Sequence, residues 1–129
     1  QRLLTLTQQR EQVEAAARAL KAGWALEKIL ALVERVRAVT DTIYTLGELK
    51  YLIHGGRISH LKGLMASVLN LKPLIGVEKV EGKYSSLGQA RTLDKALRKI
   101  PEHIATIYPR GTALRAQIMH AFNPEGAAI

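Results

Sequence analysis

The segment Thr45–Ile58, TLGELKYLIHGGRI, holds the densest group of local structural signals in the chain. Thr45 and Glu48 are spaced as a capping box, in which the threonine hydroxyl and the glutamate carboxylate close the first turn of a helix. Apolar residues follow at helical spacing, and Gly55–Gly56 is where that short helix is predicted to end. β-Branched and aromatic residues at 40–45 precede it, so the segment predicts a strand that leads into a helix.

Working outward, apolar residues at i, i+3, i+4 and i+7 predict two helices before this segment, at 9–22 and 25–38, joined by a tight turn. After it, an apolar stripe predicts a helix at 60–70 that Pro73 ends. The remaining predicted elements are a strand at 74–77, a turn at 81–82, a strand at 84–87, a helix from Thr92 that Pro101 kinks or restarts, and a strand at 112–119. The order is α-α-β-α-α-β-β-α-β, so we expect an α+β fold with helices covering a mixed sheet.

Length and composition describe one ordinary domain. The 129 residues are 47% hydrophobic and 23% charged, which is enough to build a core. The chain has no cysteine, which excludes a disulfide scaffold, a thiol nucleophile and a cysteine-based zinc site, and fits a reducing compartment. It contains no apolar run of the roughly 20 residues that span a bilayer and no secretory leader pattern, so we expect a cytoplasmic protein.

Both ends indicate a fragment. The chain begins with Gln1 instead of methionine. At the other end Asn123 and Pro124 are strong signals for the start of a helix, yet barely one turn of residues follows them. We therefore expect residues 1–129 to be a single truncated domain.

The charge of the chain is strongly basic. Lysine and arginine outnumber aspartate and glutamate 19 to 11, giving a net charge of +8. This balance admits nucleic acid, an anionic membrane surface or an acidic protein as a partner. Aromatic residues make up only 5% and are scattered, which disfavours single-stranded nucleic acid because such binding needs stacking platforms. A basic module for nucleic acid stays open as the alternative function.

The window Leu49–Val77 combines an anion site with an apolar stripe. It has no aspartate or glutamate but several lysines, histidines and Arg57. A Gly-Gly-Arg sequence before a helix exposes backbone N–H groups and a guanidinium to an anion, and the adjoining stripe suits the tail of an amphiphile. The same residues also fit a plainer interpretation, namely a helix C-cap, a surface arginine and a core-facing helix.

The order of residues in this window resembles the DegV family. Thr45–Ile58 is similar to the TLEYLKKGGRI signature of that family, and Leu64–Ile75, LMASVLNLKPLI, is similar to its LLGSLLNIKPIL. The similarity includes Leu26–Ile29, continues through Gln89–Thr92, and extends to Ile118–Glu125, IMHAFNPE, which resembles IVHADNPEEA. It covers about residues 12–127 of the chain.

The resemblance implies a bacterial lipid-binding protein that is not an enzyme. DegV proteins hold one long-chain fatty acid between two α/β domains, and in some bacteria they present it to a fatty acid kinase. Against that pattern the chain corresponds to the core of the second domain, without the N-terminal domain and without the final C-terminal segment. We therefore expect a long-chain fatty acid as the ligand and no other cofactor. The expected partners are the missing domain, a fatty acid kinase and an anionic membrane surface.

Physical chemistry agrees with a lipid tunnel. Burying the roughly 14 methylenes of a C16 tail at ~0.8 kcal/mol each gives about 11 kcal/mol before ordering costs. The apolar stripe would supply one wall, Met65 would adapt to different tails, and Arg57 would meet the head group or the membrane. The family match places His120 near the lipid. The predicted lipid-binding residues are Arg57, Ile58, Leu61, Leu64, Met65, Val68, Leu69, Leu74, Ile75 and His120.

The sequence gives little support for a metal site or a catalytic site. The four histidines, at 54, 60, 103 and 120, lack a carboxylate spaced to complete a metal site on one element, so no metal is expected. The serines lack the nucleophile-elbow context of a hydrolase. An enzyme is the third interpretation, and no catalytic constellation supports it.

Overall fold

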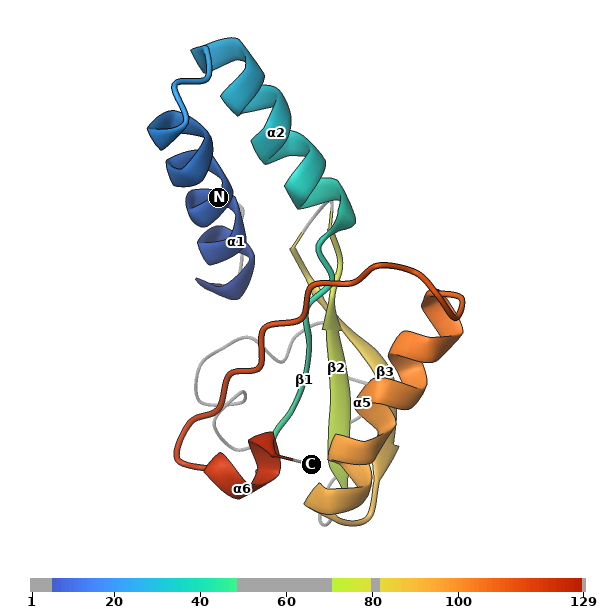
Figure 1. The fold of residues 1–129 in the computed structure, drawn as a ribbon. Coiled ribbons are helices and arrows are strands. Elements are labelled where there is room, and N and C mark those ends of the chain that lie inside the picture. Colours follow the sequence, from blue (N-terminus) through green and yellow to red (C-terminus); the bar gives the residue numbers. More distant parts are fainter. Residues whose placement is uncertain (1–5, 49–70, 80–81, 129) are drawn as a thin grey trace. The chain divides into compact units, whose positions relative to one another are not determined.

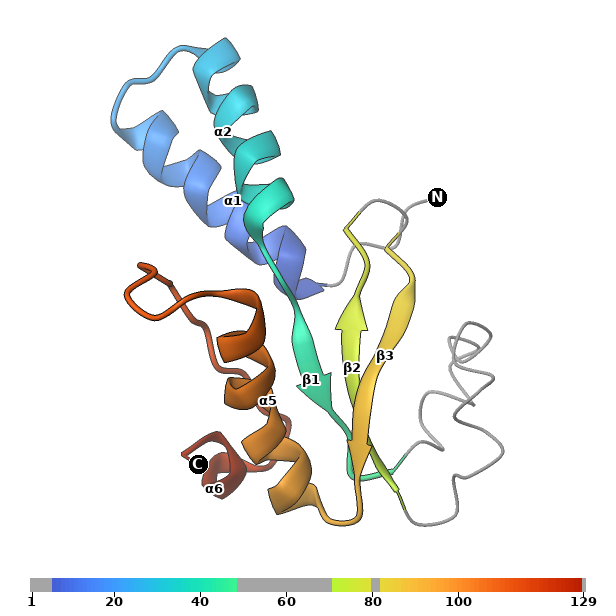
Figure 2. The same ribbon diagram turned by 90° about the vertical axis from the view of Figure 1, so that its right-hand side faces the viewer.

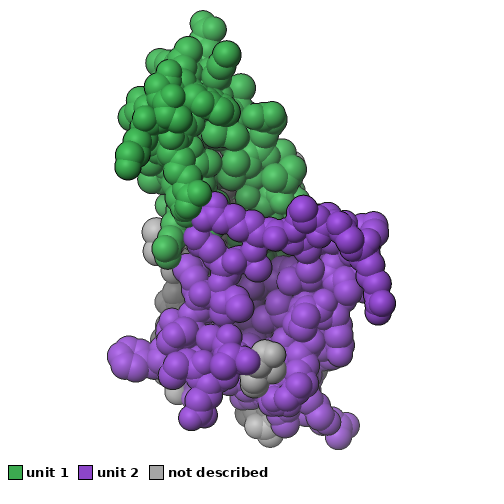
Figure 3. All heavy atoms as spheres, in the orientation of Figure 1, with its two compact units in different colours: residues 1–42, 76–85 green, residues 43–75, 86–129 purple. Residues whose placement is uncertain are grey.

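The computed structural model of the chain describes residues 6–48, 71–79 and 82–128 (Figure 1). The described elements are α1 (Leu6–Lys21), α2 (Leu26–Val39), β1 (Ile43–Thr45), β2 (Lys72–Val77), β3 (Tyr84–Ala90), α5 (Leu93–Ile107) and α6 (Pro124–Ala127). They divide into two compact units, residues 1–42 with 76–85 and residues 43–75 with 86–129 (Figure 3). That the whole chain is one truncated domain stays a prediction.

The first unit contains a helical hairpin, as predicted. α1 packs against α2, with Ala19 and Ile29 buried. The turn between them is a Schellman motif: the Trp24 amide donates to the Ala19 carbonyl and the Gly23 amide to the Leu20 carbonyl, both at 3.0 Å. Gly23 has φ +75°, a conformation that side chains disfavour, which explains why glycine ends the helix here.

The first unit also holds the tip of the β2–β3 hairpin. The Glu78 amide donates to the Lys83 carbonyl at 2.9 Å, and the Gly82 amide donates back to Glu78 at 3.0 Å. An ion pair of 3.0 Å joins Lys79 to Asp41, next to the end of α2. The predicted turn at 81–82 lies partly outside the described residues.

The described strands form a three-stranded sheet in the order β1-β2-β3. Neighbouring strands point in opposite directions (Figure 2), so this part of the sheet is antiparallel, whereas the sequence suggested a mixed one. β2 is central and buried from Pro73 to Val77. The segment that follows α5, predicted as a further strand, is not a strand. The α+β class itself is confirmed.

α5 packs on the sheet in the second unit, where it contacts β1 (Figures 1 and 2). Thr92 caps the helix as predicted, its hydroxyl accepting the Lys95 amide at 3.3 Å. Ala96 is the residue of this helix that is fully buried. The helix continues through Pro101 to Ile107, so the proline does not restart it, and a kink at Pro101 stays a prediction.

Two local predictions were wrong. Residues 112–119 carry the alternating pattern of a strand but have no regular secondary structure, and Leu114 and Ile118 are exposed. Alternation describes the side chains of a strand, whereas its stability needs a neighbour that completes the backbone hydrogen bonds. The capping box is also not formed by Thr45: the residue ends β1, and its buried hydroxyl has no partner among the described residues.

The predicted helices after Thr45 and at 60–70 lie outside the described residues. The helical turn at the C-terminus is present as α6, with the Asn123 side chain accepting the Gly126 amide at 3.0 Å. None of the described helices is long and apolar enough to cross a membrane.

Candidate functional site

The structure describes three of the ten predicted site residues. Leu74, Ile75 and His120 all belong to the unit formed by residues 43–75 and 86–129. The other seven lie outside the described residues: Arg57, Ile58, Leu61, Leu64, Met65, Val68 and Leu69. Their roles stay predictions.

Leu74 and Ile75 sit at the centre of β2 and are 2% and 0% exposed. Consecutive residues of a strand point to opposite faces of the sheet. Both faces are therefore covered at this point. It also follows that no more than one of the two side chains can line the same wall of one ligand tunnel.

Lys72 opens the same strand and belongs to the acid-free window. Its ammonium group donates a hydrogen bond to the carbonyl of Gly47, which follows β1. The lysine thus ties the chain after β1 to the start of β2. Its charge is engaged with the backbone in the second unit, which makes a structural role the better interpretation for this cation.

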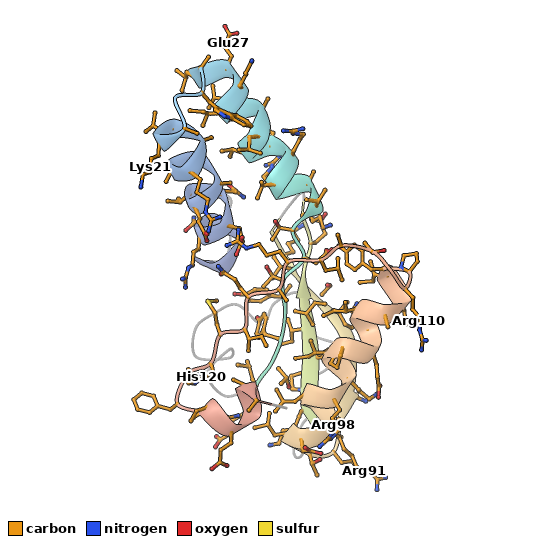
Figure 4. The ribbon with its side chains drawn as sticks, in the orientation of Figure 1. Lys21, Glu27, Arg91, Arg98, Arg110 and His120 are labelled. Atoms are coloured by element: carbon orange, nitrogen blue, oxygen red, sulfur yellow. The ribbon has the colours of Figure 1, made fainter. Side chains whose placement is uncertain are left out.

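His120 lies in the turn that leads into α6 (Figure 4), and its side chain is exposed. Its Nδ1 accepts the Asn123 amide at 3.3 Å. A neutral imidazole that accepts at Nδ1 carries its proton at Nε2, so the outer nitrogen is a donor. A donor in this position suits a carboxylate or another anion.

Sequence reasoning did not predict that the large apolar residues before and after His120 are exposed. Leu114, Ile118, Met119 and Phe122 are all at least half exposed, and Phe122 has a left-handed φ of 54°. The alternating pattern of residues 112–119 was interpreted as one face of a strand. A strand and an exposed irregular segment differ in whether another strand pairs with them. The sequence of this segment alone does not report that.

The lysines and arginines of α5, namely Lys95, Arg98 and Lys99, lie in the first half of the helix. Arg98 pairs with Asp94 at 3.1 Å, and both side chains are more than half exposed. Exposed pairs at this spacing contribute little to stability. Arg91 and Arg98 lie together near the start of the helix, whereas Arg110 lies beyond its other end (Figure 4). Among the described residues, no three histidine or acidic side chains come together as metal ligands would.

Comparison with known proteins identifies one family. The sequence model of the family described as "Uncharacterised protein, DegV family" matches residues 3–129 of this chain. A DegV domain-containing protein of Deinococcus radiodurans is 34% identical over 116 residues, which are 90% of this chain and 40% of that protein. The chain thus spans about two fifths of the length of this relative.

Two solved structures resemble the described fold. A DegV family protein from Thermus thermophilus, described as fatty acid binding, is 30% identical with a TM-score of 0.65, covering 74% of this chain and 33% of that one. A DegV family protein from Ruminococcus gnavus, solved with vaccenic acid, is 27% identical with a TM-score of 0.63, covering 75% and 34%.

Proposed function

Because the chain belongs to the DegV family, we propose that it takes part in holding one long-chain fatty acid, as a carrier with no catalytic activity of its own. The observation that carries this proposal is its similarity to the Thermus protein, whose structure is described as fatty acid binding, at 30% identity. The Ruminococcus protein, solved with vaccenic acid, supports the same class of ligand.

In the proposed site, apolar residues contact the tail of the fatty acid and polar residues contact its carboxylate. The tail would run along the apolar residues predicted at 58–69 and past one of the two neighbours Leu74 and Ile75. Each methylene removed from water contributes about 0.8 kcal/mol, so most of the affinity would come from this contact. The carboxylate would meet Arg57 and the Nε2–H donor of His120. No metal or other cofactor takes part.

The proposal extends to the partners of a carrier. The N-terminal domain of a longer protein would close the other side of the lipid, and a fatty acid kinase would receive it. The absence of cysteine fits a reducing compartment, and we propose the cytoplasm. An anionic membrane surface would be the source of the lipid. Net charge is the only feature that favours nucleic acid instead.

The test is a calorimetric titration of the 129-residue chain with cis-vaccenate, with octanoate as the short-chain control. We expect affinity to rise steeply with chain length, because each added methylene is buried. The bulky variant Met65→Trp should weaken vaccenate binding, whereas Leu30→Trp, on the exposed side of α2, should not. Equal affinity for both acids would contradict the proposal, and so would the absence of vaccenate binding in a longer protein that joins this chain to the proposed N-terminal domain.

The same samples also test the alternative function, which is nucleic-acid binding. A chain that binds nucleic acid through charge loses affinity for a DNA duplex steeply as salt rises. Vaccenate binding should depend on salt much less, because its main term is apolar burial. Tight, salt-sensitive DNA binding without vaccenate binding would favour the nucleic-acid module.

A further inference from the structure

The turn between His120 and Asn123 contains a strained residue. Within the described part of the chain, Phe122 is the non-glycine residue with a left-handed backbone, at φ 54°. Left-handed φ is unfavourable for any residue with a β-carbon. The side chain of Phe122 is fully exposed, so packing of the ring does not offset the strain. Such strain persists where neighbouring interactions hold the backbone, and it concentrates at functional sites.

Hydrogen bonds on both sides of Phe122 hold this backbone. The Asn123 amide donates to Nδ1 of His120 at 3.3 Å, and the Asn123 side chain accepts the Gly126 amide at 3.0 Å. A β-carbon at Gly126 would collide with the Asn123 side chain, so the glycine leaves room for it over the first turn of α6. Asn123 therefore joins His120 to α6.

The cap of α6 does not require the bond to His120. An N-cap needs the Asn123 side chain and an amide of the first helical turn, and the Gly126 amide supplies that contact. The left-handed Phe122 and the bond from the Asn123 amide to Nδ1 are additional to the cap. They act on the imidazole, because a nitrogen that accepts a hydrogen bond leaves the proton of a neutral ring on the other nitrogen.

Phe122 lies between the donor and the acceptor of this bond. The peptide group that carries the Asn123 amide directly follows Phe122, so the backbone angles of Phe122 help to set where that amide points. An extended φ at Phe122 would rotate the peptide group and take the amide away from Nδ1.

We propose that Phe122 is a positioning residue for His120. Its left-handed backbone keeps the Asn123 amide on Nδ1, which fixes the orientation of the imidazole and the tautomer that donates through Nε2. The inference rests on the proposed function in one respect, because the acceptor offered to Nε2–H is the carboxylate of the fatty acid.

The test is nuclear magnetic resonance of the ¹⁵N-labelled chain at about pH 8.5, where ordinary histidines are neutral. Long-range correlations within the imidazole report which nitrogen carries the proton. A coupling across the hydrogen bond reports contact between the Asn123 amide and Nδ1. We expect the Nε2–H form and this coupling for His120, whose signals His120→Gln removes. His103, which is not part of the turn, is the internal reference.

Phe122→Asn and Phe122→Val form a matched pair. Both remove the aromatic ring, so a difference between them reports the backbone. Asparagine tolerates left-handed φ, whereas a β-branched residue is a genuine outlier there. Phe122→Asn should keep the coupling and the wild-type tautomer, and Phe122→Val should lose the coupling and show a mixture of tautomers. The Lys95 amide, bonded to the Thr92 cap of α5 in the same unit, should be unchanged in both and so report an intact fold.

Three results would overturn the inference. Absence of the coupling in the wild type would mean that the turn does not hold His120. A Phe122→Val variant with the wild-type coupling and tautomer would mean that the left-handed backbone is not needed. Equal loss in both variants would assign the effect to the ring and not to the backbone.

Vaccenate titration tests the link to the proposed function separately. A hydrogen bond to a carboxylate contributes about tenfold in affinity, so Phe122→Val should bind vaccenate about tenfold more weakly than Phe122→Asn. If the tautomers behave as described but vaccenate binds equally to both variants, or to neither, His120 does not hold the carboxylate. The proposed function then fails at this residue, and the positioning of His120 by Phe122 stands.

Discussion

Truncating either central residue of β2, by Leu74→Ala or by Ile75→Ala, should destabilise the chain to a similar degree but weaken fatty-acid binding in only one case. Both side chains are buried, at 2% and 0% exposure, so each truncation leaves a cavity. They point to opposite faces of the sheet because they are consecutive in a strand. A ligand tail on one face contacts one of them and not the other.

The magnitudes follow from burial. Truncation of a buried leucine or isoleucine to alanine costs about 2–5 kcal/mol. For a chain of this size 1 kcal/mol corresponds to about 4 °C in melting temperature, so each variant should melt about 8–20 °C lower. Three lost methylene-sized contacts at about 0.8 kcal/mol weaken ligand affinity by roughly 50-fold in the variant that faces the tail.

The assay is thermal unfolding with and without cis-vaccenate. Ligand at about 100 times its dissociation constant stabilises the folded chain by about 2.7 kcal/mol, or about 11 °C. In the variant that faces the tail, the same concentration is only about twice the dissociation constant, and the shift falls to about 3 °C. Ile29→Ala, in the helical hairpin, is the matched control: it creates a comparable cavity and should keep the full shift.

Each pattern of vaccenate-induced shifts in the three variants has a different explanation. If both β2 variants keep the full shift, neither residue belongs to the site. If both lose it while Ile29→Ala keeps it, the assignment of the two residues to opposite faces is wrong. If all three lose it, the shift reports overall stability and not contact with the ligand.

Three further variants test local features by thermal unfolding. Phe122→Asn should raise the melting temperature by about 4 °C, because it removes about 1 kcal/mol of left-handed backbone strain; a decrease would mean that the ring has an intramolecular contact. Pro101→Ala should stabilise by about 1–2 kcal/mol, since it restores an amide donor in the interior of α5; destabilisation would argue against a continuous helix. Thr92→Ala should cost about 1 kcal/mol, whereas Thr92→Ser keeps the cap; equal losses would show that the hydroxyl is not the capping group.

The helical hairpin was predictable because its signals are local. The apolar stripes of the two helices and the glycine between them specify both helices and the Schellman turn, and the observed bounds differ from the predicted ones by only a few residues. Thr92 and Asn123 were likewise recognised as caps, since a cap satisfies backbone groups within its own turn. Such features depend on residues that are neighbours in sequence.

The strand predictions show that an apolar or alternating pattern does not by itself report whether a pairing strand is present. The strands at 74–77 and 84–87 are present as β2 and β3, somewhat longer than predicted, and a short hairpin connects them. Residues 112–119 have an equally good alternating pattern, yet they do not form a strand. Pairing is a property of two segments, so the pattern of one segment does not identify its partner; β1, predicted at 40–45, is present and pairs with β2 across a long connection.

The candidate site shows the same limit in another form. Apolar periodicity reports that a side chain avoids water, but it does not report what covers it. For Leu74 and Ile75 the covering is the protein itself, and whether one of them also touches a lipid depends on which face the ligand uses. For Ile118 and Phe122 no described part of the chain provides the cover. The fatty acid that we propose as the ligand is an apolar partner of the kind that periodicity alone does not identify.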